Sequence, residues 1–255
     1  MSHWQFQTKQ FLLPKSGHAL SECEDAIGIN AATRRFAVAD GATEAFDSQT
    51  WARSLAHDWV ELEPTEQTRE EFRAWVAKRG QSLHDSWNGL RLSWYAEEKA
   101  RTGSFAAFVG VQLELDEPSP SWKAIALGDS CLLHRRNEEI LQALPISDYE
   151  SFNATPLLVP SQLTMQDRAL ENLVVASGTL RDGDVLLLLS DAIAAWYLML
   201  VEKDDQIRSA FDLLLKAGQA DELRQLMEKH RLSGKLKDDD VAAIRIELFF
   251  CNASC

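Results

Sequence analysis

Residues 34–44 read RRFAVADGATE, a short apolar run that ends in Asp40 and Gly41. Three further apolar runs carry an aspartate at one end: Asp129 in WKAIALGDS (122–130), Asp191 in DVLLLLSDA (184–192) and Asp239 in LKDDDVAAIRI (236–246). Short apolar runs bounded by turn residues are typical of buried strands. We therefore expect four carboxylates at strand ends, converging where the strands stop.

Carboxylates near a protein core need a compensating partner. A charged side chain is costly to bury, so it persists there when it is paired or binds a metal ion. Several oxygen ligands favour a hard divalent cation such as Mg²⁺ or Mn²⁺. The sequence has no matching cluster of His and Cys that would favour zinc. The aspartates therefore predict a site for Mg²⁺ or Mn²⁺.

The order of five segments carries a family resemblance. They are ECEDAIGI (22–29), FAVADGATEAF (36–46), ALGDS (126–130), LLLLSDA (186–192) and DDDVAAIRI (238–246). In this order and spacing they resemble the metal-dependent type 2C (PPM) serine/threonine protein phosphatases of the bacterial subgroup. The resemblance extends over residues 17–248, nearly the whole chain, and rests on all five segments together.

The resemblance implies an α+β fold, a four-layer αββα sandwich of two antiparallel β-sheets flanked by helices. It implies a single phosphatase domain over residues 1–255, in which the proline-containing segment at about 145–182 looks like an irregular insertion. The implied activity is hydrolysis of phosphoserine and phosphothreonine in proteins. In that family the attacking water bridges two divalent metal ions.

The resemblance assigns metal ligands residue by residue. Asp40 would bridge two Mg²⁺ or Mn²⁺ ions, and the Gly41 carbonyl would ligate one of them. Asp191 and Asp239 would complete the pair of sites, so that Asp40, Asp191 and Asp239 form the catalytic set. Asp239 lies in a run of three aspartates, and the register leaves a neighbouring aspartate open as the ligand.

Three further acidic residues match outer positions of that site. Glu24 and Asp25 correspond to an acidic pair that touches the metal ions mainly through water. Asp129 corresponds to a residue that helps Asp191 hold a third, weaker ion. A purely structural hydrogen-bonding role is an equal alternative for Asp129.

The chain also departs from the family pattern. No arginine precedes the Glu24–Asp25 pair, where the family has its phosphate-binding arginine. His18 resembles a histidine of a bacterial subgroup and is our candidate for substrate phosphate, with a structural role equally open. Ala42 lies where some members of the family have a histidine, and it cannot act as a general acid. Ala192 lies where the family usually has a glycine. These changes motivate a second hypothesis, a weak or inactive relative that binds a phosphoprotein or partner without turnover.

Composition restricts the partners. The chain has 26 Lys and Arg against 39 Asp and Glu in 255 residues, a net charge of −13, which argues against nucleic acid. The four cysteines have no disulfide-framework or zinc spacing. We find neither a signal peptide nor a membrane span and expect a cytoplasmic protein. The expected partners are phosphorylated proteins and a cognate serine/threonine kinase.

The remaining elements follow from periodicity. Strands are expected at 4–13, 26–30, 34–39, 104–115, 122–127, 131–136, 184–190 and 241–249. Helices are expected at 47–62, at 67–100 with breaks or kinks at Gly80 and Gly89, and at 192–231 with divisions near Asp204 and Gly218. The five tryptophans between 51 and 94 are expected in the core beneath these helices.

Overall fold

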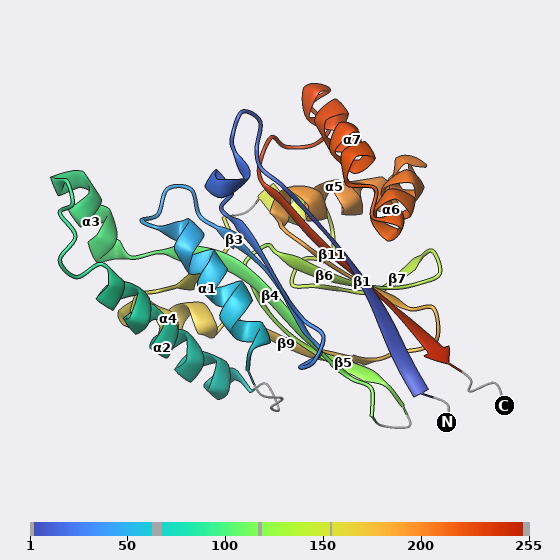
Figure 1. Ribbon diagram of the computed structural model, residues 1–255, viewed down its shortest axis with the longest axis horizontal. Helices are drawn as coiled ribbons and strands as arrows, with labels where there is room; N and C mark the ends of the chain where they lie inside the picture. The colour runs from blue at the N-terminus through green and yellow to red at the C-terminus, as the bar shows by residue number, and fades with distance from the viewer. Residues whose placement is uncertain (1–2, 63–67, 117–118, 154, 252–255) are drawn as a thin grey trace.

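Two antiparallel sheets stacked face to face, with helices on both outer sides, make up the molecule (Figure 1). The computed structural model describes residues 3–62, 68–116, 119–153 and 155–251. This is the expected α+β, four-layer αββα sandwich. Each layer follows from where the apolar side chains of the strands point.

The first sheet has the strand order β1-β11-β10-β6-β7. Its strands are β1 (His3–Leu13), β11 (Val241–Cys251), β10 (Val185–Leu189), β6 (Cys131–Arg136) and β7 (Glu139–Leu144). Strand β1 pairs with β11 along its whole length, from His3 opposite Cys251 to Leu13 opposite Val241. The two ends of the described chain therefore lie side by side (Figure 1).

The second sheet has the order β2-β3-β4-β5-β9. Its strands are β2 (Asp25–Asn30), β3 (Arg35–Gly41), β4 (Phe105–Glu114), β5 (Ser121–Leu127) and β9 (Val174–Thr179), and the short β8 (Val159–Pro160) pairs with the start of β4. The β2–β3 register sets Asp25 opposite Asp40. All eight expected strands are present, with ends shifted by at most two residues.

Central strands are buried on both faces, which explains their unbroken apolar sequences. Phe36 and Val38 of β3 face the other sheet, whereas Ala37 and Ala39 face helix α1 (Ser48–Val60). Helix α1 buries Trp51, Leu55 and Trp59 against this sheet. Side chains alternate along a strand, so each strand needs apolar residues at every position to fill two cores.

The remaining helices cover the two outer faces. Helices α2 (Arg69–Ser86) and α4 (Leu163–Leu170) lie with α1 on the second sheet, and α3 (Trp94–Thr102) projects from this layer (Figure 1). Helices α5 (Asp191–Glu202), α6 (Ile207–Ala217) and α7 (Ala220–Leu232) cover the first sheet. Short 3₁₀ turns occur at η1 (Leu20–Glu22) and η2 (Glu150–Asn153).

Three expectations need correction. Within the helical stretch expected at 67–100, the break at Gly89 is confirmed, since the chain turns there with φ +83° between α2 and α3. The chain does not break at Gly80, which lies inside α2, where a Cβ atom would come 2.2 Å from the Ser161 carbonyl oxygen. Trp94 is 77% exposed and lies outside the core. The segment 145–182 is not irregular throughout, since it contains η2, β8, α4 and β9.

No helix among the residues placed by the structure has both the length and the apolar character needed to cross a membrane.

Candidate functional site

The expected aspartates gather at one end of the sandwich. Asp25 and Asp40 face each other across the β2–β3 pair, and Asp191 begins α5 directly after β10. Asp129 lies in the turn between β5 and β6, and Asp239 lies just before β11. The carboxylates are close enough to raise one another's pKa. The fold therefore brings residues from both sheets into a single acidic cluster.

Asp40 is half-buried at the end of β3, on the inner part of this cluster. Burial raises the pKa of Asp40 well above its ordinary value. The charges of Asp25, Asp191 and Asp129 raise the pKa further. Gly41 follows, and its N–H donates to the Glu24 carbonyl at 3.2 Å. A Cβ atom at position 41 would lie 2.7 Å from the Ser48 carbonyl oxygen, so only glycine lets α1 begin this close to β3.

Asp25 is the most unusual member of the cluster. It is 3% exposed, and both of its Oδ atoms are buried without a hydrogen-bond partner. Burial raises the pKa of this carboxyl well above its ordinary value, the Ser190 hydroxyl opposes this effect, and the nearby charges of Asp191 and Asp240 add to it. Two unsatisfied carboxylate oxygens are costly, and they are the kind of donor that a divalent cation would satisfy. These oxygens are of the type that Mg²⁺ or Mn²⁺ prefers, although no set of three such ligands is assembled among the described residues.

A lysine lies among the same carboxylates. The Lys237 Nζ atom is 2.9 Å from Asp191 Oδ2 and 2.7 Å from Asp239 Oδ2. Burial alone would lower the pKa of Lys237, but the two carboxylates outweigh it and raise the pKa above its ordinary range. Within the described ranges, no three acidic, His or Cys side chains are arranged so that they could hold a metal ion. The Lys237 ammonium supplies a positive charge on this side of the cluster.

The three consecutive aspartates have different contacts. Asp240 accepts hydrogen bonds from the backbone N–H groups of Lys15 and Glu24, each at 2.7 Å. Asp238 accepts from both the backbone N–H and the hydroxyl of Ser16. Asp240 and Asp238 therefore hold the β1–β2 loop, whereas the Asp239 side chain faces Lys237.

Glu24 fastens the loops around the cluster. Its carboxylate accepts hydrogen bonds from Thr43 Oγ1 at 2.7 Å, Ser48 Oγ at 2.9 Å and Lys15 Nζ at 3.2 Å. These contacts join the β1–β2 loop, the β3–α1 loop and the start of α1. Thr43, which follows the Asp-Gly turn, thereby acquires a structural role.

Comparisons with known proteins were made at the levels of sequence and structure. No protein-family model and no curated protein sequence matches the chain. Solved structures do match over nearly the whole length. PppA, a key regulatory component of the T6SS in Pseudomonas aeruginosa, has 18% identity and a TM-score of 0.57, covering 98% of this chain and 100% of its own.

Two further solved structures that match are phosphatases, one acting on serine and threonine and one of photosystem II. The catalytic domain of the serine/threonine protein phosphatase PstP, solved with two manganese ions, has 18% identity and a TM-score of 0.58, covering 98% of this chain and 100% of its own. The photosystem II phosphatase PBCP has 16% identity and a TM-score of 0.61, covering 95% and 98%. The chain has the fold of the PPM-type serine/threonine phosphatases.

Within this PPM fold, His18 lies apart from the inner carboxylates. It is exposed in the β1–β2 loop, and its backbone N–H donates to the Lys15 carbonyl at 3.1 Å. Its side chain lies near Asp238, and its charge is a minor contribution to the lowered pKa of that carboxyl, after the hydrogen bonds from Ser16. His18 therefore lies at the outer rim of the cluster.

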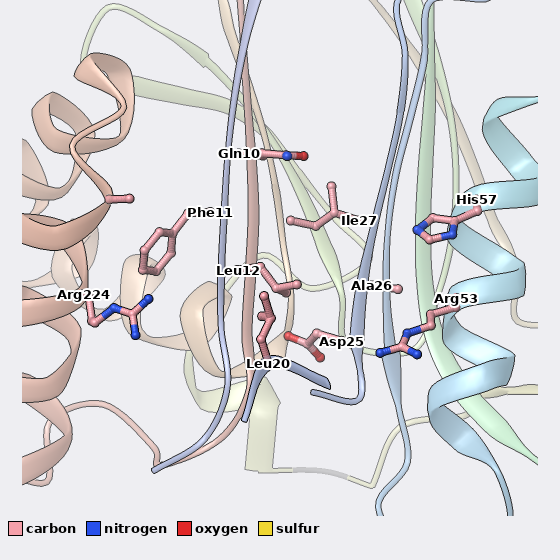
Figure 2. Close-up of a pocket in the computed structure, with 11 residues that line it drawn as sticks. Gln10, Phe11, Leu12, Leu20, Asp25, Ala26, Ile27, Arg53, His57 and Arg224 are labelled. Atoms are coloured by element: carbon pink, nitrogen blue, oxygen red, sulfur yellow. The ribbon is translucent and has the colours of Figure 1, made fainter. Parts of the chain in front are cut away.

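A pocket of about 400 Å³ adjoins the cluster at Asp25 (Figure 2). It runs between β1 and β2, with Arg53 and His57 of α1 on one side and Arg224 of α7 on the other. Apolar side chains of β1 and β2 line its wall, among them Phe11, Leu12 and Ile27. The pocket gives the PPM fold a cationic rim beside its acidic cluster.

Sequence reasoning did not single out Lys15 or Lys237, and both donate to acidic residues of this site. Lys237 directly precedes the three aspartates, and Lys15 is the only Lys or Arg between the end of β1 and the Glu24–Asp25 pair. Their position close to the acidic motifs in the sequence is the only feature that could have pointed to these two lysines.

Proposed function

We propose that this chain is a Mg²⁺- or Mn²⁺-dependent serine/threonine protein phosphatase, a phosphoric monoester hydrolase. The observation that carries the proposal is the buried carboxylate of Asp25 beside Asp40, in a cluster of aspartates at one end of a PPM fold. Such a cluster destabilises the protein unless a cation binds there. The fold of PstP, whose structure contains two manganese ions, supports the same choice of cofactor.

The proposed roles follow the family pattern. Asp40, the Gly41 carbonyl, Asp191 and Asp239 would hold two ions, and Glu24 and Asp25 would contact them through water. Asp129 is the proposed contact to a third ion. Bound divalent ions would supply an activated water and neutralise charge on the phosphoryl oxygens.

His18 is our proposed contact to the substrate phosphate. Its place at the exposed rim of the cluster suits a group that meets an incoming phosphoprotein. An imidazole binds phosphate less strongly than the bidentate guanidinium of arginine, so the bound cations would provide most of the affinity.

The proposal extends to the setting of the protein. The two sheets share an apolar core, which supports treating residues 1–255 as a single phosphatase domain. Substrates would be phosphorylated proteins in signal transduction, made by a cognate serine/threonine kinase in the cytoplasm of a bacterium.

A second candidate is a catalytically weak or inactive relative that binds a phosphoprotein without turnover. The contact of Lys237 with two of the proposed ligands favours it, as does the absence of an arginine from the loop before Glu24.

Hydrolysis assays separate the two candidates. Purified protein is incubated with p-nitrophenyl phosphate and with a phosphothreonine peptide, in EDTA, in Mg²⁺ and in Mn²⁺. The phosphatase proposal expects phosphate release from both substrates with either ion and none in EDTA. Binding of the phosphopeptide without release in any ion would support the second candidate instead.

A further inference from the structure

Lys237 lies where its charge bears directly on the acidic cluster. It belongs to the loop between α7 and β11, two residues before Asp239, whose N–H donates to the Lys237 carbonyl at 3.0 Å. This tight turn points its side chain back over the aspartates. The Nζ atom lies within 2.9 Å of one carboxylate from the start of α5 and of another from its own loop.

One nitrogen thus joins two carboxylates that come from distant parts of the chain. Both contacts use Oδ2 atoms, at 2.9 Å on Asp191 and 2.7 Å on Asp239. A Mg²⁺ or Mn²⁺ ion ligated by these two oxygens would have to lie between them, at about 2.0–2.2 Å from each. An ammonium and a divalent ion cannot fill this space together, and each repels the other.

The lysine is able to leave. Its side chain is 62% exposed, whereas the side chains of Asp191 and Asp239 are 16% and 30% exposed. Lysine has a long, flexible stem, and the solvent beside it is a favourable place for its charge. Moving the Lys237 side chain into solvent therefore breaks its two ion pairs but loses few packing contacts.

On the opposite side of the cluster, no ion pair to Asp25 or Asp40 occurs among the described residues, and Lys15 pairs with Glu24 instead. The Asp25 carboxylate is buried with no hydrogen bond of ordinary length at either oxygen, the Ser190 hydroxyl being close enough only to lower its pKa, and it faces Asp40 across the β2–β3 pair. The cluster is therefore asymmetric: one side has its own cation, and the other has an unsatisfied acidic pair.

We propose that Lys237 is a tethered cation that competes with a divalent ion for the Asp191 and Asp239 carboxylates. The inference rests on the metal site of the proposed function. The protein then binds one divalent ion tightly beside Asp25 and Asp40, and a second one weakly, after Lys237 has swung into solvent. Occupancy of the second position depends on the concentration of free metal ion.

The experiment counts bound Mn²⁺ by isothermal titration calorimetry, with the number of free ions checked by electron paramagnetic resonance. Four proteins are compared: the wild type, Lys237→Met, the charge-keeping Lys237→Arg and a control, Lys235→Met, which changes an exposed lysine two residues earlier. We expect the wild type and Lys235→Met to bind one ion tightly and a second at least about tenfold more weakly. Lys237→Met should strengthen the second site at least about tenfold, because no ammonium has to leave. Lys237→Arg, which keeps the charge, should resemble the wild type.

Thermal melting provides a readout that is independent of turnover. In EDTA, Lys237→Met should melt below the wild type, because two carboxylates lose their counter-ion. In saturating Mn²⁺ the order should reverse, whereas Lys235→Met should follow the wild type in both conditions.

Equal Mn²⁺ affinities in the wild type and Lys237→Met would overturn the inference, and so would a failure of both proteins to bind Mn²⁺. An increase in the KM for a phosphopeptide with unchanged Mn²⁺ binding would also overturn it, since Lys237 would then be a phosphate contact. A wild type that binds Mn²⁺ with the expected two affinities but hydrolyses nothing contradicts the proposed function alone.

Discussion

Asp40 takes part in the mutual repulsion of the cluster, because it interacts with Asp25 from the neighbouring strand and with Asp191 and Asp129 from elsewhere. Its carboxylate thus destabilises the folded protein when no cation is bound, and in the proposed function it helps to bind the cation. The same charge has opposite effects on the stability and on the proposed activity.

The substitution Asp40→Asn separates these effects, since it keeps the shape and removes the charge. We expect Mn²⁺ binding to weaken at both positions and phosphatase activity to fall by about 100-fold or more. In EDTA the melting temperature should equal or exceed that of the wild type, because one repelling charge is gone. Calorimetry with Mn²⁺ and a melting curve in EDTA measure both outcomes. A variant that is markedly less stable in EDTA would make Asp40 a structural residue.

His18 is a rim residue with an exposed side chain, so its replacement should leave the fold intact. If it contacts substrate phosphate, His18→Ala should raise the KM for a phosphothreonine peptide several-fold, with metal affinity unchanged. His3→Ala is the matched control, because His3 is also exposed but lies at the other end of β1 from the β1–β2 loop. An unchanged KM combined with a lower melting temperature would assign His18 to packing.

Among the elements, the β1–β2 loop is held in place by the chain segment that precedes β11. Asp240 is 4% exposed and accepts two backbone N–H groups of that loop, those of Lys15 and Glu24. Hydrogen bonds to a charged acceptor are stronger than those between neutral groups. Asp240 therefore positions Glu24, and with it the neighbouring Asp25.

Asp240→Ala should leave two N–H donors without their acceptor. We expect it to lower the free energy of unfolding by about 2–4 kcal/mol, and Asp240→Asn to lower it less, because the amide keeps one acceptor oxygen. Urea denaturation of the two variants measures the difference. The control Asp238→Ala removes an acceptor that is exposed and should cost less. Equal losses at positions 238 and 240 would contradict this account.

Apolar runs ending in aspartate predicted the strands around the site well, because strands β3, β10 and β11 are buried on both faces and contain few polar residues. Besides the short β8, strands β7 and β9 were not predicted. Both are edge strands, and their sequences EILQAL and VVASGT alternate between exposed and half-buried positions, with only Leu144 buried. Half-buried edges do not need the apolar pattern that identifies a strand.

At the site, the sequence order predicted which aspartates converge, but it gave no role to Lys237 or Lys15. Their contacts depend on how two loops, distant in sequence, meet at one end of the sandwich. A lysine next to an acidic run also has an ordinary explanation as a solvent-exposed charge. Only the tertiary structure distinguishes a lysine that contacts the site from one that is merely exposed to solvent.

Across the whole molecule, the acidic cluster makes stability depend on pH in a predictable direction. The pKa of Asp129 is raised to about 6, first by burial and then by the charge of Asp191, and the pKa values of Asp25 and Asp40 are also raised. A carboxyl with a raised pKa binds its proton more tightly in the folded state than in the unfolded state. Folding is therefore least penalised below the unfolded pKa, near 4, and the penalty grows as the pH rises through about 6.

In EDTA the protein should accordingly melt at a higher temperature at pH 5 than at pH 7.5, by about 5 °C. Mn²⁺ at pH 7.5 should remove the difference, since a bound cation favours the ionised carboxylates. Asp184 acts in the opposite direction: burial would raise its pKa, but hydrogen bonds from Arg136 and His134 lower it, so its stabilising effect is lost only in more acidic solution. Melting curves from pH 5 to 8 test the prediction, and a metal-free protein that becomes more stable toward pH 7.5 would refute it.

The pairing of β1 with β11 also fixes when the cluster can form during synthesis. Lys15 and Asp240, which are joined by a hydrogen bond, are 225 positions apart in the chain. At about 5–20 residues per second, a ribosome needs roughly 10–45 s to make the chain between them. Throughout that interval β1 has no partner strand, and Asp40 lacks the residues around position 239. A newly made chain therefore cannot assemble the complete acidic cluster until β11 has left the ribosome.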